Sequence, residues 1–239
     1  MGHRPHRDID DVLILEGLSK RFRQGSSSVT GLDDVSLTLR RGDFTAVMGP
    51  SGSGKTTMLQ MAGLLDHPDS GRVILEGGDM TDLPERRRSQ IRLERCGFVF
   101  QEHNLIPVLT AFENAEMVLL LQGLGASERL RRVGPLFEAF GMAELLDRRP
   151  EALSGGQRQR VAVIRAVAAN PSVLFCDEPT AGLDTEAARG VMDLLEHMHR
   201  ERGATILLTT HDDRIARRAR RLLRLTDGRI SEDRCAADG

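Results

Sequence analysis

Short apolar runs alternate along this chain with turns rich in glycine, proline and charged residues. Residues 35–39 alternate apolar and polar side chains with a period of two, which predicts a half-buried antiparallel strand. Residues 44–48 and 173–176 are continuously apolar, which is typical of parallel strands covered on both faces. Further strands are expected at residues 12–15, 18–23, 73–75, 97–100 and 204–209, and a hairpin at 222–230 around Asp227 and Gly228.

Helical patterns fill most of the remaining chain. One helix follows Lys55 and ends before Pro68, and another is expected at residues 185–202. Two arginine-rich segments predict a helix or loop at residues 86–94 and a basic helix at 212–220, with the runs 86–88 and 217–221 on solvated faces. In the middle of the chain only helices are expected, at residues 110–122, 126–140 and 154–169.

This order of elements predicts an α/β fold with a core of mostly parallel sheet, an antiparallel β subdomain and an inserted helical subdomain. We expect one domain over residues 12–230, in which the core comprises 12–103 and 171–230 and the helical subdomain comprises 104–170. Residues 1–11 and 231–239 are expected to form tails.

Composition narrows the functional classes. The 239 residues include 33 Lys and Arg against 35 Asp and Glu, a net charge of −2, so the charge balance does not call for a nucleic acid or an anionic membrane. Cys96, Cys176 and Cys235 show no metal-ligand spacing, which favours a reducing cytosol. The apolar runs are far shorter than the roughly 18–20 residues of a membrane span, and residues 1–11 lack the apolar core of a secretory signal. A soluble chain is expected.

A glycine-rich loop follows the apolar run at 44–48. The loop has the spacing of a nucleotide phosphate loop: Gly49, four further residues, then Gly54, Lys55 and Thr56. Its glycines let backbone N–H groups point into one hollow, at which the next helix directs its positive end. Lys55 is expected to reach the β- and γ-phosphates, and the Thr56 hydroxyl to hold Mg²⁺; the alternative is an ordinary glycine turn. The predicted nucleotide-binding residues here are Gly49, Pro50, Ser51, Gly52, Ser53, Gly54, Lys55, Thr56 and Thr57.

Two acidic residues follow the buried run at 173–176. Asp177 and Glu178 therefore lie at the carboxyl edge of the expected sheet, where open α/β sheets bind ligands. Beside a phosphate loop, Asp177 is the expected partner of Mg²⁺, and Glu178 is placed to polarise an attacking water. The alternative for this pair is a helix N-cap.

A second potential anion site begins the helix at 154–169. Ser154 is a favourable N-cap, and Gly155 and Gly156 after it leave backbone N–H groups exposed before Gln157. The alternative is a capped helix with a flexible entry. If both helix ends bind phosphate, either two nucleotides bind to the chain or two chains share each nucleotide.

The motifs together resemble those of ABC-type ATPases. Residues 153–157 (Leu-Ser-Gly-Gly-Gln) resemble the signature motif of that family, and the order is also similar: the phosphate loop, Gln101, the signature, the Asp-Glu pair, then His211. The resemblance extends from about residue 12 to 230. Residues 97–101, 104–107 and 109–114 resemble more narrowly the lipoprotein-release and macrolide-export branch, of the LolD and MacB type.

The resemblance implies that ATP lies between the phosphate loop of one subunit and Ser154, Gly155, Gly156 and Gln157 of another, in a homodimer that closes on ATP and opens after hydrolysis. It implies that Glu178 and His211 act in hydrolysis with Lys55 and Gln101, and that Thr56, Gln101 and Asp177 hold Mg²⁺. Asp184 resembles the family's dimer-contact loop. Phe22 falls at the position of the aromatic residue that stacks on adenine, with a core phenylalanine as the alternative.

Function then follows from the resemblance as an expectation. The chain is expected to be the ATP-hydrolysing subunit of a membrane transporter, located in the cytoplasm at the inner face of the membrane and bound to a separate permease. Leu105, Ile106 and Leu109 are expected to form an apolar lip of the permease groove. The alternatives are a force-transmitting regulatory membrane complex and a soluble ABC ATPase of translation or DNA repair; no nucleic acid partner is expected.

Overall fold

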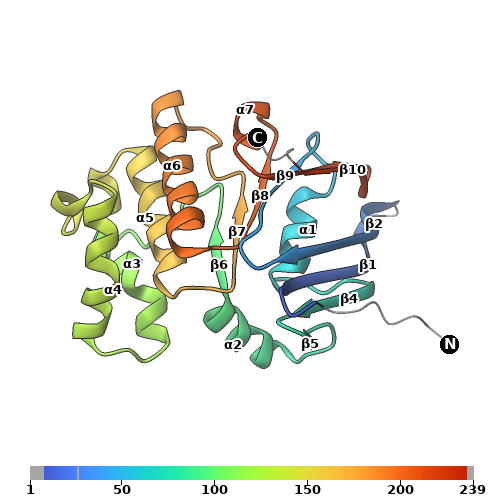
Figure 1. The fold of residues 1–239 in the computed structure, drawn as a ribbon, viewed down its shortest axis with the longest axis horizontal. Coiled ribbons are helices and arrows are strands. Elements are labelled where there is room, and N and C mark those ends of the chain that lie inside the picture. Colours follow the sequence, from blue (N-terminus) through green and yellow to red (C-terminus); the bar gives the residue numbers. More distant parts are fainter. Residues whose placement is uncertain (1–7, 26, 236–239) are drawn as a thin grey trace.

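The structure is a computed structural model in which residues 8–25 and 27–235 are described. Most of the predicted tail at 1–11, and the last four residues of that at 231–239, lie outside the described residues. Figure 1 shows helices α3 (Ala111–Leu121), α4 (Ala126–Ala139) and α5 (Gly155–Ala168) together at one end of the molecule, opposite the antiparallel strands β1 (Asp11–Gln24) and β2 (Ser27–Arg40).

A six-stranded sheet forms the centre, in the order β10-β9-β3-β8-β7-β6. All neighbouring pairs are parallel except β10 with β9, which form the expected hairpin around Asp227 and Gly228. Both turn residues have positive φ, at 49° and 77°, which suits a two-residue hairpin turn. The strands are β3 (Phe44–Met48), β6 (Cys96–Val99), β7 (Val173–Asp177), β8 (Ile206–Thr210), β9 (Arg221–Thr226) and β10 (Arg229–Cys235).

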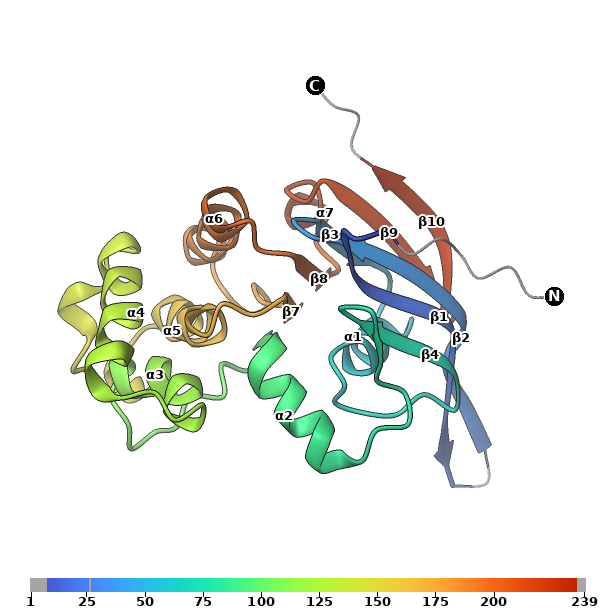
Figure 2. The same ribbon diagram turned by 60° about the horizontal axis from the view of Figure 1, so that its bottom comes forward.

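The second sheet is antiparallel, in the order β2-β1-β4-β5, with β4 at Ser70–Leu75 and β5 at Gly78–Asp79. The segments predicted at 12–15 and 18–23 form one strand, β1, whose register shifts between Glu16 and Ser19. Helix α1 (Lys55–Ala62) contacts both sheets, and Figure 2 shows it between them.

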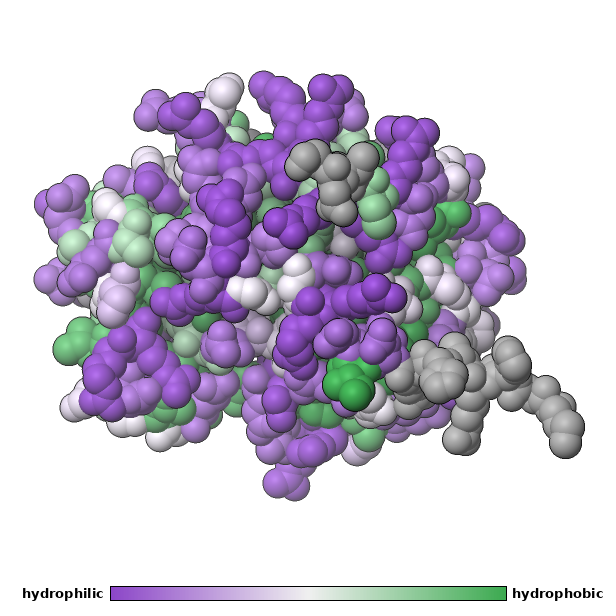
Figure 3. All heavy atoms as spheres, viewed as in Figure 1, coloured by the Kyte–Doolittle hydropathy of each residue, from purple (hydrophilic) through white to green (hydrophobic). Residues whose placement is uncertain are grey.

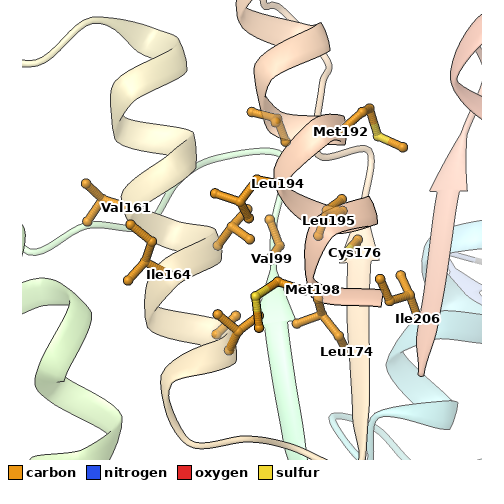
Figure 4. Packing of buried hydrophobic residues seen from close by; sticks show 14 of the residues in the cluster. Val99, Val161, Ile164, Leu174, Cys176, Met192, Leu194, Leu195, Met198 and Ile206 are labelled. Carbon is orange, nitrogen blue, oxygen red and sulfur yellow. The ribbon is translucent and has the colours of Figure 1, made fainter. Parts of the chain in front are cut away.

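Alternating side chains of the central strands build two cores. Phe44, Ala46 and Met48 of β3 belong to the cluster beneath the helices α3, α4, α5 and α6 (Thr185–Arg202), whereas Val47 belongs to the cluster around α1. This period of two explains why the continuously apolar strands are buried on both faces. Figure 4 shows part of the first cluster: Leu194 and Met198 of α6 lie against the strands, near Val99 and Leu174, whereas Val161 and Ile164 lie on the side of α5 that faces away from the strands.

Helix α2 (Glu85–Arg95) is bound to the end of α1 by arginines. The expectation that residues 86–88 face solvent is wrong for Arg88, whose surface is only 3% exposed. Its Nη2 donates to the carbonyls of Leu64 (2.7 Å) and Asp66 (2.5 Å), and Nη1 of Arg92 also donates to Leu64 (2.7 Å). The carbonyls after α1 have no helical partners, and this arginine pair satisfies them.

The basic helix predicted at 212–220 is much shorter than expected, since α7 covers only Asp213–Ala216. The chain must leave the helix there because the Arg220 N–H donates to the Phe44 carbonyl (3.0 Å) and strand β9 begins at the next residue. Arg218 and Arg221 are not simply solvated either, because they form ion pairs with Asp193 and Glu196 and with Asp233. Strand β10 continues to Cys235, into the segment expected to be a tail.

The face of the molecule in Figure 3 is largely hydrophilic, with hydrophobic residues in small separate patches. Within residues 8–25 and 27–235, no helix combines the length and the hydropathy that a membrane crossing requires. Cys96 and Cys176 are buried thiols and Cys235 is exposed, and all three are free. Burial raises the pKa of Cys176, so its thiol inside β7 behaves as a small apolar group.

Candidate functional site

The glycine-rich loop joins β3 to α1 and is shaped by close backbone approaches. A Cβ at Gly49 would lie 2.2 Å from the Leu225 carbonyl oxygen, and one at Gly54 would lie 2.2 Å from that of Gly31. Gly54 also has φ 103°, a conformation that side chains other than hydrogen disfavour, and it is the N-cap of α1. The loop between them makes a turn, in which the Ser53 N–H donates to the Pro50 carbonyl (3.2 Å). Both glycines are therefore required by the geometry.

Lys55, the first residue of α1, lies beneath this loop. Its Nζ donates to the carbonyls of Gly49 (2.7 Å) and Pro50 (3.1 Å) and lies 3.8 Å from Oε1 of Glu178. The loop thus encloses a largely buried cation at the N-terminus of α1, which is the positive end of the helix dipole. Such a hollow favours a multiply charged anion.

The acidic pair lies where β7 ends, as the sequence predicts, with Asp177 as the last residue of the strand. Oδ1 of Asp177 accepts hydrogen bonds from two hydroxyls, those of Thr56 (3.2 Å) and Thr209 (2.6 Å). Thr56 is the second residue of α1 and Thr209 belongs to β8, so three separate elements meet at this carboxylate.

Glu178 adopts an uncommon backbone conformation, with φ 46°. A left-handed conformation costs a non-glycine residue about 1–3 kcal/mol and is concentrated at functional sites. Its Oε2 lies 2.9 Å from Nδ1 of His211, while Oε1 faces Lys55. The carboxylate therefore lies between the cation of the phosphate loop and an exposed imidazole.

A cavity of about 650 Å³ opens above these groups, a size that suits a small-molecule ligand. Gln101, Glu178 and His211 line it together with the phosphate loop, and Phe22 and Gly31 line another part. Phe22 is 39% exposed and is not the core phenylalanine that was the alternative. A Cβ at Gly31 would lie 2.6 Å from the Phe22 ring, so this glycine leaves the space that the ring occupies.

The signature segment has the expected cap but lies at a different cavity. Ser154 and Gln157 form a reciprocal capping box at the start of α5, in which each side chain accepts a hydrogen bond from the other residue's N–H. Ser154, Gly156 and Asp184 line a separate cavity of about 270 Å³. A Cβ at Gly156 would lie 2.6 Å from the Cβ of Ala187, so the first turn of α5 packs closely on α6.

Helix α5 also holds the segment that carries Gln101. Nε2 of Gln159 donates to the Phe100 carbonyl (3.0 Å), and the guanidinium of Arg165 donates to the carbonyls of Asn104 (2.7 Å) and His103 (3.0 Å). Burial and the charge of Arg158 lower the pKa of His103, so this histidine is uncharged at neutral pH. The position of Gln101 is thereby tied to the signature helix.

The residues predicted to hold Mg²⁺ suit a hard cation. Thr56 and Asp177 present oxygens that already lie 3.2 Å apart, and Gln101 lines the same cavity. Magnesium prefers oxygen ligands and is commonly bound through one or two protein groups together with substrate phosphates and water. The geometry is therefore compatible with a magnesium–nucleotide complex.

Residues 32–181 match the model of a protein family described as ABC transporter. The chain belongs to the ABC transporter family. It is 43% identical to the lipoprotein-releasing system ATP-binding protein LolD 1 of Rhodopseudomonas palustris, in an alignment covering 92% of this chain and 99% of that protein. It is 40% identical to an uncharacterized ABC transporter ATP-binding protein, MJ0796, of Methanocaldococcus jannaschii, covering 93% and 96%.

A longer relative is the macrolide export ATP-binding/permease protein MacB of Syntrophobacter fumaroxidans, which is 43% identical over 93% of this chain. The chain spans only 32% of that protein's length. These relatives confirm the predicted resemblance to the LolD and MacB branch of the ABC family.

Solved structures agree with the fold. A dimeric structure of MJ0796, described as a bacterial ABC transporter cassette, matches with a TM-score of 0.88 at 36% identity, over 95% of this chain and 100% of that one. Another dimeric structure of MJ0796, in a post-hydrolysis state with ADP and Pi, matches with a TM-score of 0.87. The predicted α/β ABC ATPase fold is confirmed, and this ABC-family chain is an ABC-type ATPase.

Sequence reasoning found most residues of the main cavity but not all. The structure brings Lys55, Thr56, Gln101, Glu178 and His211 together, and it leaves the segment 154–157 apart from them. The reasoning missed Thr209, although a threonine at the end of an otherwise apolar buried strand is a signal that could have been read. It also missed Val29, Thr30 and Gly31, which line the cavity beside Phe22 and carry no recognisable motif.

Proposed function

We propose that this ABC-family chain hydrolyses ATP as a homodimer and thereby drives a separate membrane permease. The observation that carries the proposal is the separation of the two anion-binding helix ends. The start of α1 and the start of α5 line different cavities, so within one chain they do not meet at one phosphate group. In a dimer, the start of α1 of one copy and the start of α5 of the other copy would together enclose each nucleotide. Similar cassettes of MJ0796 have been solved as dimers.

In this arrangement the phosphate loop and Lys55 bind the phosphates, while the ring of Phe22 stacks on the base. Ser154, Gly155, Gly156 and Gln157 of the second copy reach the γ-phosphate with the positive end of α5. Asp184 lies beside Ser154 in the smaller cavity, which is the side of the chain that would face the partner. A triphosphate satisfies both helix ends at once, so ATP favours the closed dimer and hydrolysis removes the bridging charge.

Thr56, Gln101 and Asp177 would hold Mg²⁺, which when bound neutralises charge on the phosphates and orients them. Glu178 is the general base, because it follows Asp177 directly in the chain and its residue lines the cavity in which the attacking water would lie. His211 contacts Oε2 of Glu178 and holds that carboxylate in position.

The permease would bind an apolar groove on the face near Gln101. A cavity of about 570 Å³ there is lined by Leu65 and Leu93, by Phe98 and Phe100, and by Val118 and Leu121. Asn104 and Arg165, which fix the Gln101 segment, line the same groove. Leu105, Ile106 and Leu109, the expected apolar lip of the permease groove, do not line this cavity, and Leu105 packs on the hydrophobic core; their contact with a permease stays a prediction.

The names of the similar proteins suggest the transported class. LolD 1 is named for lipoprotein release and MacB for macrolide export. We therefore propose export, or extraction of a lipid or lipoprotein from the membrane, with the ATPase at the inner membrane face.

The test is whether ATP closes a dimer that needs both helix ends. The Glu178→Gln variant is expected to bind ATP, to lose at least ~10²-fold in turnover and to migrate as a dimer with ATP, in line with the usual weight of a general base. Adding Ser154→Ala and Gly155→Asp should return it to a monomer, because a negative charge then blocks the second helix end at a position where an added Cβ meets nothing closer than Leu183 at 3.5 Å. Light scattering with and without ATP reads the result. A Glu178→Gln protein that stays monomeric at saturating ATP contradicts the proposal.

A further inference from the structure

Thr209 occupies a position beside the acidic pair that is fixed by strand register. It is the register partner of Asp177 in the parallel pair of β8 with β7. Leu207, two residues earlier, belongs to the cluster around α1, so the period of two turns Thr209 toward the same face. Its surface is only 1% exposed. A hydroxyl is thus buried next to the helix that carries Lys55 and Thr56.

This hydroxyl uses both of its hydrogen-bonding capacities within the acidic pair. Oγ1 of Thr209 donates to Oδ1 of Asp177 over 2.6 Å and accepts from the Glu178 N–H over 3.0 Å. The Glu178 N–H also approaches the carbonyl oxygen of Thr209 (3.2 Å). One side chain therefore joins a carboxylate and the main chain of the next residue.

Both contacts bear on groups whose orientation matters. Oδ1 of Asp177 accepts from Thr209 on one side and from Thr56 on the other, so the rotation of the carboxylate is restricted. Glu178 keeps a left-handed backbone, with φ 46°, which persists only where surrounding contacts enforce it. The two contacts from Thr209 to the Glu178 N–H supply that enforcement and direct the side chain toward Lys55 and His211.

We propose that Thr209 is a positioning residue that sets the metal-facing carboxylate of Asp177 and the backbone turn at Glu178 with a single hydroxyl. The inference rests on the proposed roles of Asp177 and Glu178 in hydrolysis, and it adds a residue that lies outside the phosphate loop, the signature segment and the Asp-Glu pair. Partners behind a metal-binding group fix its orientation, and their loss commonly costs about 10- to 100-fold in metal affinity or activity.

The chain supplies a matched control in the neighbouring strand. Thr45 of β3 is also a buried threonine, and β3 pairs with β8, where Thr45 lies opposite Leu207. Among residues 8–25 and 27–235, its Oγ1 has no hydrogen-bond partner. Changing Thr45 to valine removes a hydroxyl from the same sheet without touching the acidic pair.

The experiment compares Thr209→Val, Thr209→Ser and Thr45→Val with the wild-type chain. Three quantities are measured: kcat for ATP, binding of Mn²⁺ in the presence of a non-hydrolysable ATP analogue, and binding of a fluorescent ATP analogue without metal. Thr209→Val is expected to lower kcat and Mn²⁺ affinity by about tenfold or more, and to leave metal-free nucleotide affinity unchanged. Thr209→Ser should restore both properties because it keeps the hydroxyl, and Thr45→Val should change none.

Three results would overturn the inference. The first is a Thr209→Val protein with wild-type kcat and Mn²⁺ affinity. The second is a Thr209→Ser protein whose kcat and Mn²⁺ affinity are no better than those of the valine variant. The third is a Thr209→Val protein that loses as much affinity for nucleotide without metal as it loses for Mn²⁺, which would show structural damage only. Failure of the proposed function appears elsewhere, as a wild-type chain without ATPase activity or a Lys55→Met variant with full activity. The Mn²⁺ measurement still reads the role of Thr209 in that case.

Discussion

Nζ of Lys55 lies 3.8 Å from Oε1 of Glu178, and both side chains are mostly buried, with 9% and 14% of their surfaces exposed. The carboxylate proposed as general base therefore shares the cation proposed to bind phosphate. Negative charges of an entering triphosphate compete with Glu178 for this ammonium. Phosphate binding is therefore expected to release the carboxylate from Lys55, while His211 remains as its second contact.

Removal of the Glu178 charge is therefore expected to tighten ATP binding as well as to stop hydrolysis. Solvent-exposed ion pairs contribute about 0.2–1 kcal/mol; with that range as the lower bound for this mostly buried pair, Glu178→Gln should lower the Kd for metal-free ATP by at least about 1.4- to 5-fold. Titration with a fluorescent ATP analogue measures it. Glu138→Gln, a charge removal on the exposed surface of α4, is the control and should leave the Kd unchanged. A weaker affinity in the Glu178 variant would contradict this competition.

A second prediction concerns the base-binding part of the cavity. Gly31→Ala would place a Cβ 2.6 Å from the Phe22 ring and 3.2 Å from Cγ2 of Thr57, so the ring must move. If Phe22 stacks on adenine in substrate and transition state alike, KM for ATP should rise several-fold with kcat little changed, by the logic of uniform binding. Steady-state kinetics test it. Gly134→Ala in α4, where the nearest atom to the added Cβ is 3.8 Å away, should change neither constant.

Much of this fold was predictable because its strongest signals are local. The continuously apolar strands β3 and β7, the spacing of Gly49 and Gly54, and the turn at Asp227 and Gly228 each depend on a few neighbouring residues. These predictions needed no knowledge of which strands pair.

Other features depend on contacts between distant segments and were not accessible from the pattern. Thr209 meets Asp177 only because β8 pairs with β7, in a register that the sequence does not state. In the sequence Arg88 is one of several consecutive arginines and looks like a surface residue. Its burial depends on the carbonyls that follow α1, whose position beside it the sequence does not give. Likewise, α7 is short because Arg220 must reach the Phe44 carbonyl at the edge of β3.

The pKa of His103 gives a third prediction. It is lowered from the usual 6.5 by burial and by the charge of Arg158. The unfolded chain therefore binds a proton at His103 more readily than the folded chain does. Above pH 6.5 this difference costs no free energy of unfolding. As the pH falls from 6.5 toward the lower pKa of the folded state, the free energy of unfolding decreases. Replacement by asparagine should reduce the loss of unfolding free energy between pH 7.5 and pH 5.5, as measured by urea denaturation.

The control for that measurement is His197→Asn, which removes a histidine from α6, a helix that does not carry the Gln101 segment. Any change in pH dependence that both variants share is then not due to the burial of His103. An identical slope in wild type and His103→Asn would show that this histidine does not contribute.

The last prediction tests the apolar groove as the permease site. Leu65 and Leu121 line it, and their surfaces are 38% and 64% exposed, so their substitution by aspartate should not disturb the core. A charge at either position would have to be desolvated when an apolar helix of the permease enters. Leu121→Asp combined with Leu65→Asp is expected to abolish co-purification with the permease, while ATP binding by the isolated chain stays intact.

Leu130→Asp is the matched control for that experiment. Leu130 is also an exposed leucine, with 57% of its surface accessible, but it lies on α4 and does not line the groove. Because the same charge is added to a surface of similar exposure, any general effect on solubility or membrane association appears in both proteins. Loss of the permease from the groove variant alone supports this docking site. Equal retention in both proteins moves the permease contact to another face of the cassette, and equal loss in both removes the assignment to the groove.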